Sequence, residues 1–233
     1  MAVSPEFKII GNGTLEKPLK YIPLNPGLVI AITLVVFTLV VPAQAAAMGG
    51  PEILALEDFI KGVMNGDGEA LRGIYVPGVF AYSIIPQPER NPAYVSTTMD
   101  TLTQFELASR YGSTGLLAHN YLAGESFSLL ENGQLLYLIY GDGRVEVFGV
   151  SRFMRFQALT PNSITSSYVD LETGDFLSAG QLFLKAYSDP GTVVLQTCIY
   201  KNGESSWGRL FIIAEPFEGE IVQAWSGLKQ ITE

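Results

Sequence analysis

The sequence predicts a mainly β fold, either a β-barrel or a closed sandwich, with a few short helices. Short apolar runs of strand length alternate with turn residues along most of the chain. Long helical repeats and alternating strand–helix units are both missing from the sequence pattern, which argues against bundles and parallel α/β folds. At 233 residues and 48% hydrophobic content the chain can bury one substantial core. We therefore expect one folded domain, preceded by an N-terminal segment.

The N-terminal segment has two parts. Residues 1–26 carry four prolines and little apolar periodicity, so we expect a disordered tail. Residues 27–48 contain an uncharged, apolar run that predicts a hydrophobic helix, close to the length of about 20 residues that spans a bilayer. Ala43-Gln44-Ala45 also fits a signal-peptidase site, and we favour cleavage over retention as an anchor. Lysines before the segment favour an extracytoplasmic location for the residues after it.

The next elements are predicted in chain order. Residues 49–74 are expected to be a linker with a short amphipathic helix over 52–64, where apolar residues recur at helical spacing. Residues 75–85 resemble one strand, and the three prolines of 86–92 indicate an extended surface loop. The apolar spacing of residues 101–111 predicts a helix that ends before Gly112.

The rest of the β domain, which we expect to span residues 75–233, is dominated by strands. A strand-like stretch leads through Leu117 into His119, and the glycines of Gly141-Asp142-Gly143 predict a hairpin. Residues 151–190 have a mixed pattern. The remaining expected elements are strands over 134–140, 144–150, 192–198 and 207–214, a short helix near 178–187, and a strand pair or turn over 221–225.

The last hairpin allows a geometric prediction about Cys198 and Arg209. Asn202-Gly203 between two apolar runs is a strong hairpin signal. If the hairpin closes symmetrically, Cys198 faces Trp207 and Gln196 faces Arg209. Cys198 and Arg209 would then share a face as diagonal neighbours about 7–8 Å apart. A one-residue bulge would place them on opposite faces.

Composition excludes several functions. The net charge of −9 and the 14 scattered Lys and Arg residues argue against nucleic-acid binding. One cysteine excludes an internal disulfide, and one cysteine with one histidine excludes a zinc site built from those ligands. Asp170, Glu172 and Asp175 suit calcium chemically, but their spacing is not that of an EF-hand loop and favours a solvated turn. We predict no cofactor and no metal.

Three motifs resemble those of the sortases, the extracytoplasmic cysteine transpeptidases of bacteria. Leu195-Gln196-Thr197-Cys198 resembles the end of their T-L-x-T-C strand, with Val194 in place of the leading threonine. Leu117-Ala118-His119-Asn120 resembles the segment around their histidine, without its usual glycine. The run from Trp207 to Ala214 resembles their arginine strand. The order agrees as well, because His119 precedes Cys198 by 79 residues and Arg209 follows it by 11.

This resemblance implies an eight-stranded sortase-type β-barrel and a thiol mechanism. Cys198 would be the nucleophile, His119 the proton carrier and Arg209 the oxyanion or substrate-carbonyl donor. Thr197 and Ala118 are expected beside the substrate. The implied partners are a peptide sorting signal of surface proteins, an amine acceptor from a cell-wall peptide or pilin lysine, and the membrane if the N-terminal segment is uncleaved. The implied location is the cell surface.

Two other functions stay open. A sortase-like domain without turnover would bind a surface peptide or partner, and the departures at Val194 and Ala118 leave room for it. A secreted cysteine peptidase would use the same residues but hydrolyse its thioacyl intermediate. Taken singly, a lone cysteine ending an apolar strand is more often a buried small hydrophobe than a nucleophile. The joint order and spacing of the three residues favour catalysis.

Overall fold

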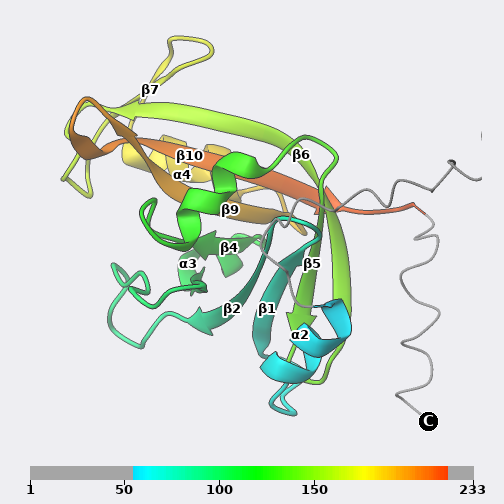
Figure 1. The fold of residues 1–233 in the computed structure, drawn as a ribbon. Helices are drawn as coiled ribbons and strands as arrows, with labels where there is room; N and C mark the ends of the chain where they lie inside the picture. Colours follow the sequence, from blue (N-terminus) through cyan, green and yellow to red (C-terminus); the bar gives the residue numbers. More distant parts are fainter. Residues whose placement is uncertain (1–54, 220–233) are drawn as a thin grey trace, which may run out of the picture. The chain divides into compact units, whose positions relative to one another are not determined.

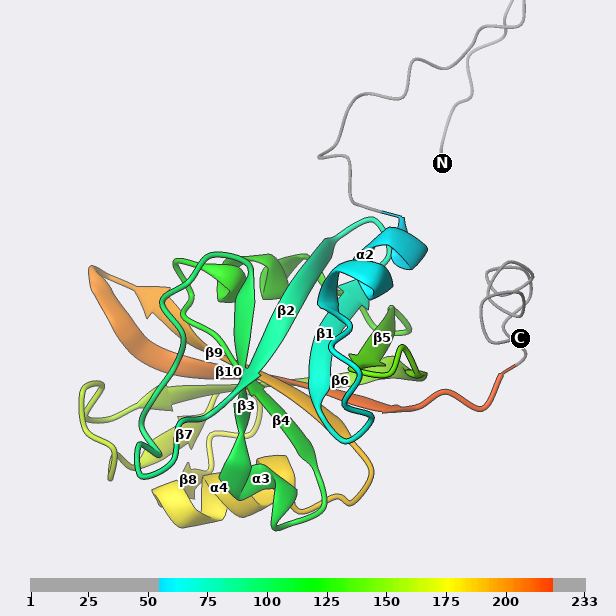
Figure 2. The same ribbon diagram turned by 90° about the horizontal axis from the view of Figure 1, so that it is seen from below.

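Eight strands close into a barrel in the computed structural model, which describes residues 55–219. The order around the ring is β10-β9-β4-β3-β2-β1-β5-β6, and β6 pairs again with β10 (Figures 1 and 2). The ring strands are β1 Leu71–Val76, β2 Phe80–Pro86, β3 Thr101–Phe105, β4 Thr114–Leu117, β5 Leu135–Tyr140, β6 Val145–Ala158, β9 Val193–Lys201 and β10 Glu204–Pro216. The mainly β fold with eight barrel strands is confirmed.

Three expected elements lie outside the described residues. They are the disordered tail over 1–26, the hydrophobic helix over 27–48, and the strand pair or turn over 221–225. Between residues 55 and 219 no helix has the length and apolar character needed to cross a membrane. The first ring strand begins at Leu71, inside the segment 49–74 that we expected to be a linker.

Short helices and a small sheet extension decorate the barrel. Strands β7 Tyr168–Asp170 and β8 Phe176–Leu177 continue the sheet beyond β6. The helices are α2 Leu56–Val63, α3 Glu106–Ser109, the 3-10 helix η1 Ala123–Leu129, and α4 Ala179–Tyr187. Helix α4 starts at a capping box, in which Ser178 accepts from the Gln181 backbone N–H while the Gln181 side chain accepts from that of Ser178. The predicted helices at 52–64 and 178–187 are confirmed.

Two sequence predictions were wrong. Residues 75–85 are not one strand: β1 and β2 form a hairpin about Pro77-Gly78, with Gly78 at φ 73° and the Val79 N–H donating to the Val76 carbonyl at 3.0 Å. This is the Pro-Gly arrangement of a type II turn. Residues 101–111 are not one helix, because Thr101–Phe105 pairs in parallel with β2 and only one helical turn follows. Pairing in the sheet overrode the helical apolar spacing there.

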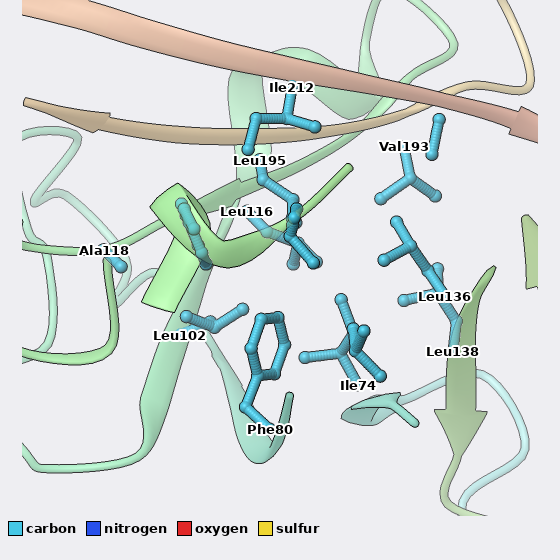
Figure 3. Packing of buried hydrophobic residues seen from close by; sticks show 14 of the residues in the cluster. Ile74, Phe80, Leu102, Leu116, Ala118, Leu136, Leu138, Val193, Leu195 and Ile212 are labelled. Carbon is cyan, nitrogen blue, oxygen red and sulfur yellow. The ribbon is translucent and has the colours of Figure 1, made fainter. Parts of the chain in front are cut away.

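Alternation along β9 separates two apolar clusters. Val193 and Leu195 point into the barrel, where they join a buried core with residues of β1, β4, β5 and β10 (Figure 3). Val194 points outward and packs in a second cluster with residues of β10 and with Tyr187 of α4. The chain between β6 and β9 therefore returns over the outer face of β9 and β10, the face that carries the candidate site.

Candidate active site

Cys198 lies on the outer face of β9, near the end of the strand. Side chains of a strand alternate between faces, so Val194, Gln196 and Cys198 share the outer face while Leu195 and Thr197 point inward. Val194 is fully buried, whereas Cys198 is a free thiol that is partly accessible. The outer face of β9 thus changes from apolar packing at Val194 to an accessible surface at Cys198.

Arg209 lies directly opposite Cys198 on the neighbouring strand β10. The prediction that they share a face is confirmed, but the predicted diagonal register was wrong. The hairpin begins in the predicted register, with Glu204 opposite Lys201, and then shifts so that Gly208 faces Ile199. Ser205, Ser206 and Trp207 oppose Tyr200 alone, and we call these three residues the β10 bulge. Because the bulge inserts two extra residues, it preserves the face and brings Arg209 level with Cys198.

His119 continues the line of β4, the other neighbour of β9. Strands β4 and β9 pair in parallel with a constant offset of 79 residues, up to Leu117 opposite Gln196. The contact continues past the strand end, because the Ala118 N–H donates to the Gln196 carbonyl at 3.1 Å and the Thr197 hydroxyl donates to the Ala118 carbonyl at 2.9 Å. Extended by one more residue, this register would place His119 beside Cys198. Arg209 is paired with Cys198 directly, whereas His119 lies two residues beyond the end of β4, on the other side of β9.

The turn after His119 is fixed by its own backbone. The His119 carbonyl accepts hydrogen bonds from the N–H groups of Leu122 and Gly124, both at 3.0 Å. The imidazole stacks on the ring of Tyr121, with centroids 5.1 Å apart and planes 19° apart. These contacts restrict both the backbone and the ring of a half-buried histidine.

The guanidinium of Arg209 is held by backbone carbonyls. One nitrogen, Nη1, donates to the carbonyls of Ser206 at 3.0 Å and Gly208 at 2.9 Å, and Nη2 donates to that of Pro161 at 3.4 Å. Pro161 belongs to the loop between β6 and β7, so this loop reaches Arg209. A guanidinium carries five N–H donors, and these three bonds leave capacity for an acceptor. Arg209 can therefore be positioned by the protein and still bind a carbonyl oxygen.

Thr197 and Ala118, the expected substrate neighbours, are both buried. The Thr197 hydroxyl donates a hydrogen bond to the Ala118 carbonyl on the inner side of the sheet. This contact fixes the spacing between the His119 segment and β9. Direct substrate contact by either residue stays a prediction, and the structure supports a role in positioning.

Gln196 was not singled out by sequence reasoning. Its side-chain carbonyl accepts a hydrogen bond from the buried Tyr187 hydroxyl at 2.6 Å. Burial raises the pKa of Tyr187 far above its ordinary value, so this hydroxyl is a neutral donor at all relevant pH values. Gln196 shares the outer face with Cys198 and marks the edge of the apolar cluster. The sequence signal for Gln196 was a polar residue at an outward position of the strand, two residues before Cys198.

The acidic turn around Asp170 is organised by the protein itself. The Asp170 carboxylate accepts from the Lys185 ammonium at 2.8 Å and from the Glu172 N–H at 2.9 Å. Asp175 accepts from the Thr173 hydroxyl at 2.7 Å. Between residues 55 and 219 no group of three or more His, Cys, Asp or Glu residues is arranged to hold a metal. Asp170 is buried and ion-paired, whereas Glu172 and Asp175 are exposed, so only part of the turn is solvated. Calcium binding stays untested.

Comparison with known proteins finds similarity among solved structures. No family model and no curated protein matches the chain. Sortase C from Clostridium perfringens SM101 is similar at 17% identity over 70% of this chain and 83% of its own, with a TM-score of 0.40. Sortase A from Corynebacterium diphtheriae is similar at 13% identity over 66% of this chain and 63% of its own, with a TM-score of 0.45.

A third similar structure is sortase C1 from Streptococcus suis, at 12% identity over 72% of this chain and 80% of its own, with a TM-score of 0.45. These structural neighbours are sortases, the family that the three sequence motifs also resemble. The roles of individual residues in this chain are inferred from the contacts around Cys198.

Proposed function

We propose that this chain is a sortase-type cysteine transpeptidase with Cys198 as nucleophile. The proposal is supported by the pairing of Arg209 with Cys198 and by the β4–β9 offset, which places His119, two residues past the last pair, in register with Cys198. A thiol, an imidazole and a guanidinium would supply a nucleophile, a proton carrier and an oxyanion donor. Each is the type of group that acyl transfer through a thioester needs.

The proposed first half-reaction acylates the enzyme. The Cys198 thiolate attacks a peptide carbonyl carbon, so that an S–C bond forms and the carbonyl oxygen becomes an oxyanion. Arg209 donates hydrogen bonds to that oxygen. When the C–N bond breaks, His119 gives its proton to the departing amine. The product is a thioester on Cys198 and a free amine.

The second half-reaction transfers the acyl group. An incoming amine loses a proton to His119 as its nitrogen attacks the thioester carbonyl. A new C–N bond forms, the S–C bond breaks, and the Cys198 thiolate is regenerated. We propose that the donor is a sorting-type peptide of a surface protein and that the acceptor is an amine of a cell-wall peptide or another surface protein.

The proposed location is extracytoplasmic, at the cell surface. It rests on the lysine-preceded hydrophobic segment over residues 27–48. Cleavage after that segment would give a secreted enzyme, and retention would give a membrane-anchored one. Intact mass measurement of the protein from its native host separates these two outcomes.

The first test measures whether Cys198 and His119 act together. The full-length chain has one cysteine, so iodoacetamide modifies a single site. We expect the pH profile of alkylation to change in His119→Ala, because the proposed proton carrier beside the thiol is lost. Slow alkylation with an identical profile in both proteins would refute the proposal and favour the binding domain without turnover.

The second test separates transfer from hydrolysis. The chain is incubated with a pool of synthetic peptides, with and without glycine amide as the acceptor, and products are identified by mass spectrometry. A transpeptidase gives glycine amide adducts, whereas a cysteine peptidase gives free acids in both reactions. Cys198→Ala should give neither product, and Arg209→Ala should slow thioester formation by roughly 100-fold or more.

A further inference from the structure

The β10 bulge contacts both sides of the candidate site through two consecutive carbonyls. The Ser205 carbonyl accepts a hydrogen bond from the Asn120 side chain, Nδ2, at 3.0 Å. The next carbonyl, that of Ser206, accepts from Arg209 Nη1, also at 3.0 Å. Asn120 directly follows His119 in the chain. The bulge is therefore a common anchor for the histidine turn and for the arginine.

We propose that Asn120 is a positioning residue that holds His119 level with Cys198 and Arg209 by tying the histidine turn to the β10 bulge. This inference rests on the proposed function. Asn120 itself does not touch the reacting atoms in this assignment. It acts through the backbone of His119, on the side of the turn that faces the β9–β10 hairpin.

The tether is needed because β4 ends before the histidine. Regular pairing with β9 stops at Leu117, and His119 lies two residues further along. The Ala118 contacts hold the turn to β9, and the His119 carbonyl is held within its own turn. On its C-terminal side the turn runs into η1, whose Ala123 and Phe127 are buried in the barrel core. The Asn120 bond adds a contact to β10, across β9 from the end of β4, and so links the histidine turn to the strand that carries Arg209.

The shape of the bulge suits this role. The Ser206 N–H donates to the Glu204 side chain at 2.9 Å, which stabilises the bulge from within. The two extra residues of the bulge bring Arg209 level with Cys198, and the Ser205 carbonyl, within the bulge, accepts from Asn120. One irregularity thus sets the position of both residues that flank the thiol.

The test compares Asn120→Ala with two references in the full-length chain, purified in mild detergent. Asn132→Ala is the matched control, because Asn132 is an exposed asparagine in a turn that contacts neither the histidine segment nor the bulge. His119→Ala shows the full change in the alkylation profile that loss of the imidazole causes. Each variant is assayed by amide hydrogen exchange of residues 118–124 and 204–208, and by the pH profile of Cys198 alkylation with iodoacetamide. Glu204, Lys201, Arg209 and Tyr121 are the nearby ionisable groups, and their identities are the same in all three variants.

In Asn120→Ala we expect exchange in both segments to rise by about two- to tenfold, since one accessible hydrogen bond is lost. We also expect the alkylation profile to move part of the way towards that of His119→Ala. Asn132→Ala should match the wild-type chain in both assays.

Either of two results would overturn the proposal. Unchanged exchange in both segments would mean that the bond does not hold them together. Faster exchange with a wild-type alkylation profile would mean that the bond is structural only. If His119→Ala itself leaves the profile unchanged, the thiol–imidazole function fails, and the exchange data still decide whether the tether exists.

Discussion

Gly124 is a position where one added methyl group should disturb the candidate site. It lies at the start of η1, against the turn that carries His119. A Cβ at this position would lie 2.7 Å from the His119 carbonyl oxygen and closer still to the Thr197 hydroxyl. The carbonyl distance falls short of ordinary contact by roughly 0.7 Å, and backbone atoms cannot rotate away as a flexible side chain does.

The expected cost of Gly124→Ala follows from these contacts. Overpacking a tight site costs about 1–3 kcal/mol. Displacing the Thr197 hydroxyl also weakens its bond to the Ala118 carbonyl, which contributes about 1 kcal/mol. We therefore expect the free energy of unfolding to fall by roughly 2–4 kcal/mol, together with a changed pH profile of Cys198 alkylation because the His119 turn moves.

The assay is urea denaturation of the full-length chain, with unfolding monitored by tryptophan fluorescence. Gly62→Ala is the matched control, since a Cβ at this helical position meets nothing within 4 Å. It should be neutral or stabilising by up to about 1 kcal/mol. Adding Thr197→Ala to Gly124→Ala should cost less than the sum of the two single changes, because one clash is removed. Equal stability of Gly124→Ala and Gly62→Ala would refute the packing argument.

Three further predictions concern the surroundings of the site. Tyr187→Phe should lower the free energy of unfolding by about 1–2 kcal/mol in urea denaturation, because the Gln196 carbonyl loses its donor; a change below about 0.5 kcal/mol would contradict it. Burial raises the pKa of Asp170, but the Lys185 ammonium and two backbone amides outweigh it, so the pKa lies below its ordinary value. The resulting stabilisation is present above the unfolded pKa of Asp170 and is lost as pH falls through its folded pKa. Lys185→Met should therefore lower the urea midpoint at pH 7 and lower it much less near pH 3. Asn202→Ala should cost about 1 kcal/mol, while Asn202→Gly should be nearly neutral, because residue 202 has φ 54°; thermal denaturation of both variants distinguishes them.

Local sequence signals predicted the β5–β6 and β9–β10 hairpins. Asn202-Gly203 has the two positive φ values, 54° and 84°, that a tight turn between twisted strands requires. Gly143, at φ 89°, similarly serves the turn between β5 and β6. These positions are readable because asparagine and glycine tolerate the left-handed region that other residues avoid.

Interactions between distant segments were not readable in the same way. The parallel pairing of Thr101–Phe105 with β2 depends on residues about 18 positions away, and the local spacing of the segment suggested a helix instead. The β10 bulge is stabilised by Glu204, and its carbonyls are used by Asn120 and Arg209. No turn motif predicts such a bulge, so the sequence predicted a shared face for Cys198 and Arg209 but not their direct pairing.

The candidate site residues themselves were identifiable because each is rare or distinctive in this chain. The only cysteine and the only histidine have a separation of 79 residues that equals the offset between β4 and β9. Gln196 and Asn120 were not singled out from the sequence, because a glutamine in a strand and an asparagine in a turn are common in any soluble protein. Their contacts with Tyr187 and Ser205 depend on the closed barrel.

The closed ring also determines how a peptide could approach Cys198. Strand β9 is hydrogen-bonded to β10 along one edge and to β4 along the other, but the pairing with β4 ends at Gln196, two residues before Cys198. Up to Gln196, therefore, neither edge is free to accept an additional strand, as occurs where peptides dock on open sheet edges. A peptide bound as proposed would lie above the sheet along this stretch and would be recognised there by side chains and by the loops over that face. The choice of substrate can then change through loop residues while the strands that hold the thiol stay the same.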